Sequence, residues 1–143
     1  MDFLSEIKSK YEIFVHGEIS SIDSINDLKT FSPVAIPQEY FDIIENSEEI
    51  EFIIKDWKQI TIWNANSCIE INRAYNIQKY ISQSIAIGDD GHDNILLYAN
   101  GKKGFGLYIA AFNNLDIDEM MYISKSLKDF ILKEIGIDVF MEA

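Results

Sequence analysis

Apolar residues along this chain follow two different periods, one typical of helices and one typical of strands. Near the N-terminus, apolar positions three or four residues apart predict a helix over Phe3–Phe14, and a second short helix is expected over Ser24–Phe31. Pro37 suits a first helical turn, and the residues around it predict a helix with one apolar face. That face consists of Ile36, Tyr40, Phe41 and Ile44. The first third of the chain is therefore expected to be helical.

Two short strands are expected next, over Ile50–Ile54 and Gln59–Trp63, because both runs are rich in β-branched and aromatic residues. The pattern then returns to helical spacing between Asn64 and Tyr75, with Asn64 or Asn66 as the capping residue. The middle of the chain thus predicts a strand pair followed by a helix.

A β-hairpin is predicted where Asn94–Ala99 and Phe105–Phe112 flank the sequence Asn-Gly-Lys-Lys-Gly. We expect positive φ at Asn100-Gly101 and at Gly104. Both runs are apolar on both faces. This pattern predicts central strands of a sheet that is at least partly covered by helices.

The last third of the chain predicts one long helix. Asp116 would cap it, Glu119 would complete a capping box, and Gly136 would end it. Its apolar stripe would consist of Met120, Ile123, Leu127, Phe130 and Ile131. Helices first, strands in the middle and a helix last predict an α+β fold. Because no repeat or linker-like segment interrupts the chain, we expect a single domain over residues 1–143.

The composition is that of a globular protein. The chain has 143 residues, of which 48% are hydrophobic and 13% aromatic, which excludes a disordered chain. The longest unbroken apolar run is Leu107–Phe112, far shorter than the roughly 20 residues that span a bilayer. The N-terminal residues lack a secretion-signal pattern, and Cys68, the single cysteine, has no partner for an internal disulfide. A cytoplasmic location is therefore expected.

Charge is the most informative global property. Twelve Lys and Arg residues against 24 Asp and Glu residues give a net charge of −12. Such a charge disfavours direct binding to nucleic acid or to an anionic membrane, and it attracts basic partners. An acidic surface also serves solubility alone, so both interpretations stay open.

The acidic residues are concentrated between Glu39 and Asp56, where Lys55 is the one basic residue. Seven carboxylates fall in this segment: Glu39, Asp42, Glu45, Glu48, Glu49, Glu51 and Asp56. Such a run is often only the solvated side of a helix end and an edge strand. Trp57 and Trp63 flank the second short strand, and tryptophan is common both in interfaces and in cores.

The segment Ile85–Tyr98 carries three aspartates and a histidine, which raises the question of a metal site. The candidate ligands are Asp89, Asp90, His92 and Asp93. A calcium loop of EF-hand type fails, because its first ligand position falls on Ala86 when Gly91 is taken as the loop glycine. Zinc or iron would require a second histidine or a cysteine, and the chain offers only His16 and Cys68. A metal is therefore disfavoured.

A turn explains the same segment more fully. Gly88 and Gly91 permit positive φ, and Asp89 or Asp90 can accept hydrogen bonds from the backbone that follows, as in an Asx-turn. Together with Asp93, these residues are expected to form a structural turn that sets the register of the next strand.

No pattern of catalytic residues is evident. The chain has no G-x-S-x-G nucleophile motif, and Cys68 lies on a predicted apolar helix stripe, where a buried, unreactive thiol is expected. Gly101 and the Gly104-Phe-Gly106 run lie in the hairpin and do not precede a helix, so they do not form a phosphate-binding loop. We therefore expect a non-catalytic protein without a cofactor.

Three segments, in order, resemble the SUKH superfamily, which includes yeast-type cell-wall-assembly regulators and many bacterial immunity proteins. They are "AIPQEYFDII", "WNANSCIEINRAYNI" and "IAIGDDGHDNILLY", and the resemblance covers about residues 24–131. Two departures occur. Asn46 is followed by Ser47 where the family often has glycine, and His92 occupies a turn position where glycine is common.

The resemblance implies an α+β fold with several helices packed against a mainly antiparallel twisted sheet. For bacterial members it implies neutralisation of a cognate toxin by protein–protein binding, without catalysis or a cofactor. An acidic immunity protein suits a basic toxin such as a nuclease. The candidate contact residues are Glu45, Glu48, Glu49, Glu51, Asp56, Trp57, Asp89, Asp90 and His92. A regulatory interaction module unrelated to toxins is the alternative, and a small metal-dependent enzyme is a third hypothesis.

Overall fold

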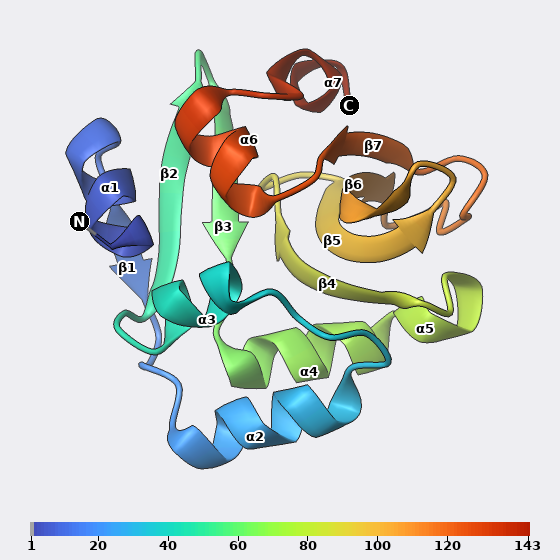
Figure 1. The fold of residues 1–143 in the computed structure, drawn as a ribbon, viewed down its shortest axis with the longest axis horizontal. Coiled ribbons are helices and arrows are strands. Elements are labelled where there is room, and N and C mark those ends of the chain that lie inside the picture. Colours follow the sequence, from blue (N-terminus) through green and yellow to red (C-terminus); the bar gives the residue numbers. More distant parts are fainter. Residues whose placement is uncertain (1) are drawn as a thin grey trace.

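Seven antiparallel strands form one open sheet whose spatial order is the order of the chain, in a computed structural model that describes residues 2–143. The strands are β1 (Phe14–His16), β2 (Glu49–Lys55), β3 (Lys58–Ile62), β4 (Ser84–Asp89), β5 (Asn94–Gly101), β6 (Gly104–Ala111) and β7 (Met121–Ser124). Each strand pairs with the strands before and after it, so the sheet is a continuous meander. β1 and β7 are its two edges (Figure 1).

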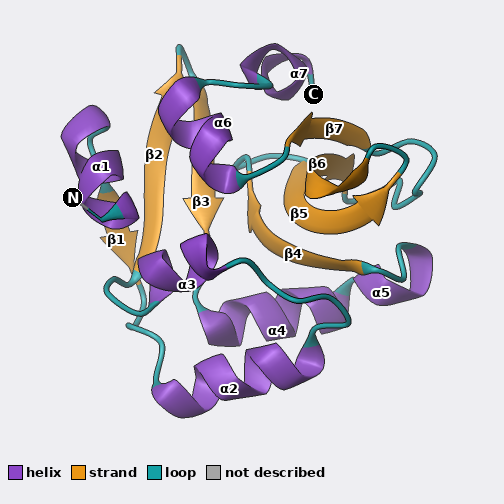
Figure 2. Ribbon diagram, viewed as in Figure 1, coloured by secondary structure: helices purple, strands orange, loops and turns teal. Residues whose placement is uncertain are grey.

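Seven helices pack against this sheet in residues 2–143, which confirms the α+β class (Figure 2). They are α1 (Phe3–Lys10), α2 (Ile22–Phe31), α3 (Gln38–Ile44), α4 (Ala65–Ala74), α5 (Ile77–Tyr80), α6 (Leu127–Lys133) and α7 (Ile137–Glu142). α1 contacts α3 and α6, α2 lies alongside α4, and α6 and α7 contact β7. None of these helices is long and apolar enough to cross a lipid bilayer.

The central strands and the middle helix confirm the sequence prediction. β2, β3, β5 and β6 fall where the patterns placed them, and α4 begins after Asn64, whose side chain accepts a hydrogen bond from the Ser67 backbone N–H. The hairpin between β5 and β6 has positive φ at Gly104 only; the expectation of positive φ at Asn100-Gly101 was wrong. Gly101 is instead packed against Tyr108, where a β-carbon would collide with the phenol ring.

The N-terminal helix ends sooner than expected. Helical geometry stops at Lys10, and Tyr11 is extended because its ring packs against Phe52 and its hydroxyl donates a hydrogen bond to the Ile131 carbonyl. The chain then forms β1, so Phe14 lies on an exposed edge strand and not on a helix stripe. The prediction of one helix over Phe3–Phe14 was therefore wrong in its second half.

The single long C-terminal helix was also wrong. Met121–Ser124 pairs with β6 as β7, Ser126 caps α6 by accepting from the Asp129 backbone N–H, and Gly136 begins α7 with φ of 83°. The apolar residues at Met120, Ile123, Leu127, Phe130 and Ile131 are buried as predicted, but Met120 precedes β7, Ile123 belongs to β7, and the other three belong to α6. Helical spacing across a strand and a helix gave the false pattern.

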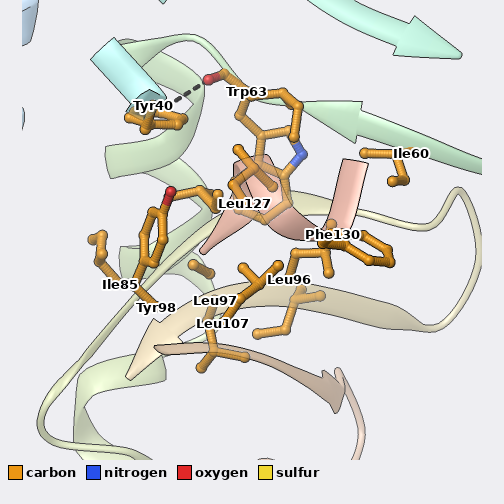
Figure 3. Packing of buried hydrophobic residues seen from close by; sticks show 14 of the residues in the cluster. Tyr40, Ile60, Trp63, Ile85, Leu96, Leu97, Tyr98, Leu107, Leu127 and Phe130 are labelled. Atoms are coloured by element: carbon orange, nitrogen blue, oxygen red, sulfur yellow. Dashed lines mark hydrogen bonds between the residues drawn. The ribbon is translucent and has the colours of Figure 1, made fainter. Parts of the chain in front are cut away.

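Buried aromatic residues connect the helices to the sheet (Figure 3). The Tyr40 hydroxyl of α3 donates to the Trp63 carbonyl at the end of β3, and Tyr98 of β5 donates to the Glu39 carboxylate. The same carboxylate accepts from the backbone N–H groups of Leu127 and Lys128 at the start of α6. Glu39 therefore has a structural role at the N-terminus of α6, where a negative charge is favoured.

Asn72 of α4 is fully buried and supplies hydrogen bonds that strand β4 lacks. Its amide N–H donates to the Ala86 carbonyl at 2.8 Å, and its amide oxygen accepts from the Ala86 N–H at 3.0 Å. β3 pairs with β4 only at two residues near the end of β4. Asn72 thus takes the place of a neighbouring strand at Ala86.

Replacing Asn72 with alanine is expected to lower the free energy of unfolding by about 2–4 kcal/mol, because the buried Ala86 N–H loses its partner and the Ala86 carbonyl keeps only the weak Cys68 S–H donor. Urea unfolding followed by tryptophan fluorescence measures the change. Asn66→Ala, at an exposed position of the same helix, is the matched control and should change stability by less than about 0.5 kcal/mol. Equal effects of the two substitutions would contradict this role.

Candidate functional site

Strand β2 has a buried side and an acidic side. Ile50, Phe52 and Ile54 are buried, whereas Glu49 and Glu51 point to the opposite side and remain partly exposed. This alternation follows from the two-residue period of a β-strand. One side of the strand therefore serves the core and the other is available to solvent.

Strand register brings the acidic side of β2 together with a third carboxylate. Glu51 lies opposite Thr61 of β3, and Thr61 lies opposite Asp89 of β4. Residues directly opposite each other project from the same side of a sheet. On β1, Phe14 is opposite Glu51 and His16 is opposite Glu49. We define the acidic face as Glu49, Glu51 and Asp89 with the neighbouring His16, Gln59 and Thr61.

Uncharged donors and one histidine hold the three carboxylates of the acidic face. Glu51 accepts from the Gln59 amide at 2.6 Å and lies 2.9 Å from His16 Nε2, and Glu49 accepts from the Ser67 hydroxyl at 3.0 Å. Asp89 accepts from Trp63 Nε1 at 2.7 Å and from the Gly91 backbone N–H at 2.8 Å. Within residues 2–143, no lysine or arginine forms an ion pair with any of the three.

Burial shifts the pKa values of two of these carboxyl groups. Burial raises the pKa of Glu49 above its ordinary value, and the charge of Asp89 raises it further, against hydrogen bonds from Ser67 and Asn64 that lower it. Burial likewise raises the pKa of Asp89, with added repulsion from Asp90 and Glu51. An ionised carboxylate at either position therefore costs folding free energy at neutral pH.

Glu49→Gln is expected to increase the free energy of unfolding by about 0.5 kcal/mol at pH 7. Glutamine can still accept the Ser67 hydrogen bond but carries no charge. A raised folded-state pKa means that the wild-type penalty is relieved as pH falls through it, so the gain should vanish below the ordinary value of 4.5. Urea titrations at pH 7 and pH 4 measure this, with exposed Glu70→Gln as the control. A loss of stability at pH 7 would contradict the prediction.

Two neighbouring turns adjoin the acidic face. Asp56, with φ of 53°, and Trp57 form the turn between β2 and β3, and Trp57 is 63% exposed. His92 belongs to the turn between β4 and β5, and its ring meets the Trp57 ring edge-on with centroids 6.5 Å apart. Trp57, His92 and Asp93 line part of an open pocket of about 460 Å³ between these turns. An exposed indole beside carboxylates suits a cationic side chain of a partner.

Lys58 and Asp90 form a buried ion pair beneath this pocket. Both residues are 1% exposed, and Lys58 Nζ lies 3.5 Å from the Asp90 carboxylate. The ammonium also donates to the carbonyls of Phe140 and Ala143 in the last helix and the residue after it. The pair therefore joins β3, the 89–93 turn and α7.

Asp90 also organises its own turn. Its carboxylate accepts from the backbone N–H groups of His92 and Asn94 and from the Asn94 side chain. Burial acts to raise the pKa of Asp90, but these hydrogen bonds and the Lys58 charge outweigh it and place the pKa below its ordinary value. The predicted Asx-turns are confirmed at both Asp89 and Asp90.

The two turn glycines differ from each other. Gly91 has φ of 79°, as expected, whereas Gly88 lies inside β4 and does not have positive φ, so that expectation was wrong. Gly88 is required for another reason, since a β-carbon there would overlap the Thr61 carbonyl oxygen. Asp93 is exposed, and its carbonyl accepts from the Phe112 backbone N–H.

The structure brings together most, though not all, of the contact residues proposed from the sequence. Glu49, Glu51 and Asp89 share one face, and Asp56, Trp57 and His92 lie on the adjoining turns. Glu45 is exposed at the end of α3 and Glu48 precedes β2; neither belongs to the rows of the acidic face. Asp90 is engaged inside the protein with Lys58, so we leave it out of the proposed contact surface.

No group of three His, Cys, Asp or Glu residues in the part of the chain that the structure describes is arranged to hold a metal ion. Cys68 is fully buried, and burial raises the pKa of its thiol to about 12. Its S–H group donates to the Ala86 carbonyl. The thiol is thus protonated and inaccessible at neutral pH.

Sequence reasoning missed three residues at or beside the site. His16 and Phe14 reach the acidic face because residues 14–16 form an edge strand, which the predicted first helix concealed. The run Ile13-Phe-Val, rich in β-branched and aromatic residues, was the available signal. Lys58 gave no signal, because only the fold shows that this lysine is buried.

The chain matches no protein-family model, and no curated protein has a significantly similar sequence. The resemblance to the SUKH superfamily therefore remains a prediction.

Proposed function

We propose that this protein is a non-catalytic immunity protein that binds a basic toxin in the cytoplasm and neutralises it by covering its functional surface. The observation that carries the proposal is the acidic face: three partly exposed carboxylates on one side of strands β2 to β4, without a lysine or arginine partner in residues 2–143. A basic protein would supply the missing cations, and binding would offset the electrostatic cost of holding Glu49 and Asp89 ionised.

The distribution of charge supports a directional encounter. The net charge of −12 attracts a basic partner. Lys10, Lys125 and Lys133 form ion pairs with Glu134 or Asp129 and with no carboxylate of the acidic face. The exposed Trp57 adds an aromatic anchor beside the carboxylates. The order of the three SUKH-like segments supports a toxin as the partner.

Co-expression with the product of the adjacent reading frame tests the proposal. We expect that product to be toxic by itself and harmless together with this protein. The double variant Glu49→Lys/Glu51→Lys should bind it about 100-fold more weakly and lose protection. The matched control Glu70→Lys/Glu119→Lys makes the same charge change at exposed positions of α4 and of the turn before β7, and it should protect.

Rates of association give an independent check. Because the Debye length is only about 8 Å at physiological ionic strength, the association rate should fall steeply as salt is raised. A neighbouring product that is harmless, or toxicity that this protein does not relieve, would contradict the proposal. Binding to a housekeeping protein in place of a toxin would instead favour a regulatory module.

A further inference from the structure

The two edges of the sheet differ in how much backbone they leave open. At β7, α6 and α7 pack against the strand, and Gly136 lies directly against the Ile123 carbonyl. At β1, all three residues are exposed, and among residues 2–143 their backbone groups have no partner besides β2. A strand from another protein can therefore extend this sheet at β1.

The acidic face continues to this open edge. Two rows of side chains run perpendicular to the strands: Phe14, Glu51, Thr61 and Asp89 cross from β1 to β4, and His16 and Glu49 cross from β1 to β2. A strand added beside β1 would place alternate side chains at the ends of these rows, about 4.8 Å from β1 and about 10 Å from β2. Long lysine and arginine side chains can cross β1 to approach Glu49 and Glu51.

The other side of β1 suits a different kind of residue in an incoming strand. Val15 lies opposite the buried Ile50, so it projects toward the helix-covered side, yet at the sheet edge it is 48% exposed. Phe14, on the acidic side, is 52% exposed and offers a ring face to a cation. An incoming strand would thus meet carboxylates and an aromatic ring on one side and an apolar edge on the other.

We propose that the partner docks by adding an extended strand to β1, in which lysine or arginine residues alternate with apolar residues. The basic side chains lie over Phe14, Glu49 and Glu51, and the apolar ones pack beside Val15. This inference rests on the proposed function for the identity of the partner, but it specifies the mode of recognition. Pairing of β1 with β1 of a second copy is disfavoured, because it would bring two acidic faces together.

Two synthetic peptides test the docking mode. Both contain four lysines and five valine or threonine residues; in one the lysines alternate with the other residues, and in the second they form one block. In NMR titrations at low salt, we expect the alternating peptide to bind about tenfold more tightly, since only its lysines all face the carboxylates. Amide signals of residues 13–17 should shift most, and outward-pointing amides of β1 should exchange more slowly with solvent.

Charge-reversal variants separate this site from general attraction. Glu51→Lys should weaken the alternating peptide about tenfold, whereas Glu70→Lys on the exposed side of α4 should not. Equal affinity for the two peptides, no binding of either, or shifts centred on Trp57 and His92 would overturn the inference. So would dimerisation of the free protein through β1.

The same measurements distinguish the docking mode from the function. If a toxin is neutralised through Glu49 and Glu51 while the β1 amides of the complex stay unprotected, the function holds and the docking mode fails. If the alternating peptide protects β1 but no neighbouring product is neutralised, the docking surface holds and the immunity function fails.

Discussion

Replacing Lys58 with methionine is expected to lower the free energy of unfolding by about 3–5 kcal/mol, because it breaks a buried ion pair and leaves one partner behind. Methionine fills a similar volume but carries no charge. The Asp90 carboxylate, 1% exposed, would lose its cation, and the carbonyls of Phe140 and Ala143 would lose a donor. The turn that positions His92 and the end of α7 would both be weakened.

Urea unfolding at pH 7 measures this effect, with the exposed Lys55→Met on β2 as the control for loss of one positive charge. Adding Asp90→Asn to Lys58→Met should recover part of the loss, since it removes the unpaired charge. The pKa of Asp90 is lowered, so its stabilising contribution is complete above the ordinary value of 3.8 and is lost as pH falls through the folded-state pKa. A loss below about 1 kcal/mol at pH 7 would contradict the prediction.

Gly88→Val is expected to lower the free energy of unfolding by about 3 kcal/mol or more, because a β-carbon at this position overlaps the Thr61 carbonyl oxygen. β3 and β4 are in register at only two residue pairs, Thr61–Asp89 and Ile62–Gly88, followed by one backbone hydrogen bond from Trp63 to Ile87. The substitution therefore acts at the junction between strands β1–β3 and strands β4–β7. The position needs glycine for the close approach of two strands and not for positive φ.

Gly104→Val separates these two causes. Gly104 has φ of 87° and open space where a β-carbon would lie, so valine there should cost only the backbone strain, about 1–2 kcal/mol. Thermal unfolding of both variants compares them directly. A smaller loss at Gly88 than at Gly104 would be inconsistent with the close contact between the strands.

The parts of the fold that could be predicted are those fixed by short local patterns. The β5–β6 hairpin is apolar on both faces and has glycines in its turn, and these features specify it without knowledge of the rest of the chain. The segment that begins at Met120 could not be assigned in this way. The spacing of its apolar residues fits a helix equally well. It forms a strand because Tyr122 pairs with Tyr108 of β6.

The candidate site was predicted in composition but not in arrangement. The sequence shows an acidic run and an aspartate-rich turn, yet their carboxylates have different roles in the structure. Glu39 caps α6, Asp90 pairs with Lys58, and Glu49 and Glu51 face solvent. Strand alternation separates Glu49 and Glu51 from the core, while the roles of Glu39 and Asp90 depend on partners distant in the chain.

The alternation along β2 has a consequence for how such a protein changes over evolutionary time. Substitutions at Glu49, Glu51 and Ile53 alter the solvent side of the strand, while Ile50 and Phe52 keep the helices in place. The proposed partner contacts and the core contacts thus fall at alternating positions of the same seven residues. When a partner changes during evolution, substitutions can accumulate at the solvent-side positions of β2, while purifying selection preserves the core-side positions.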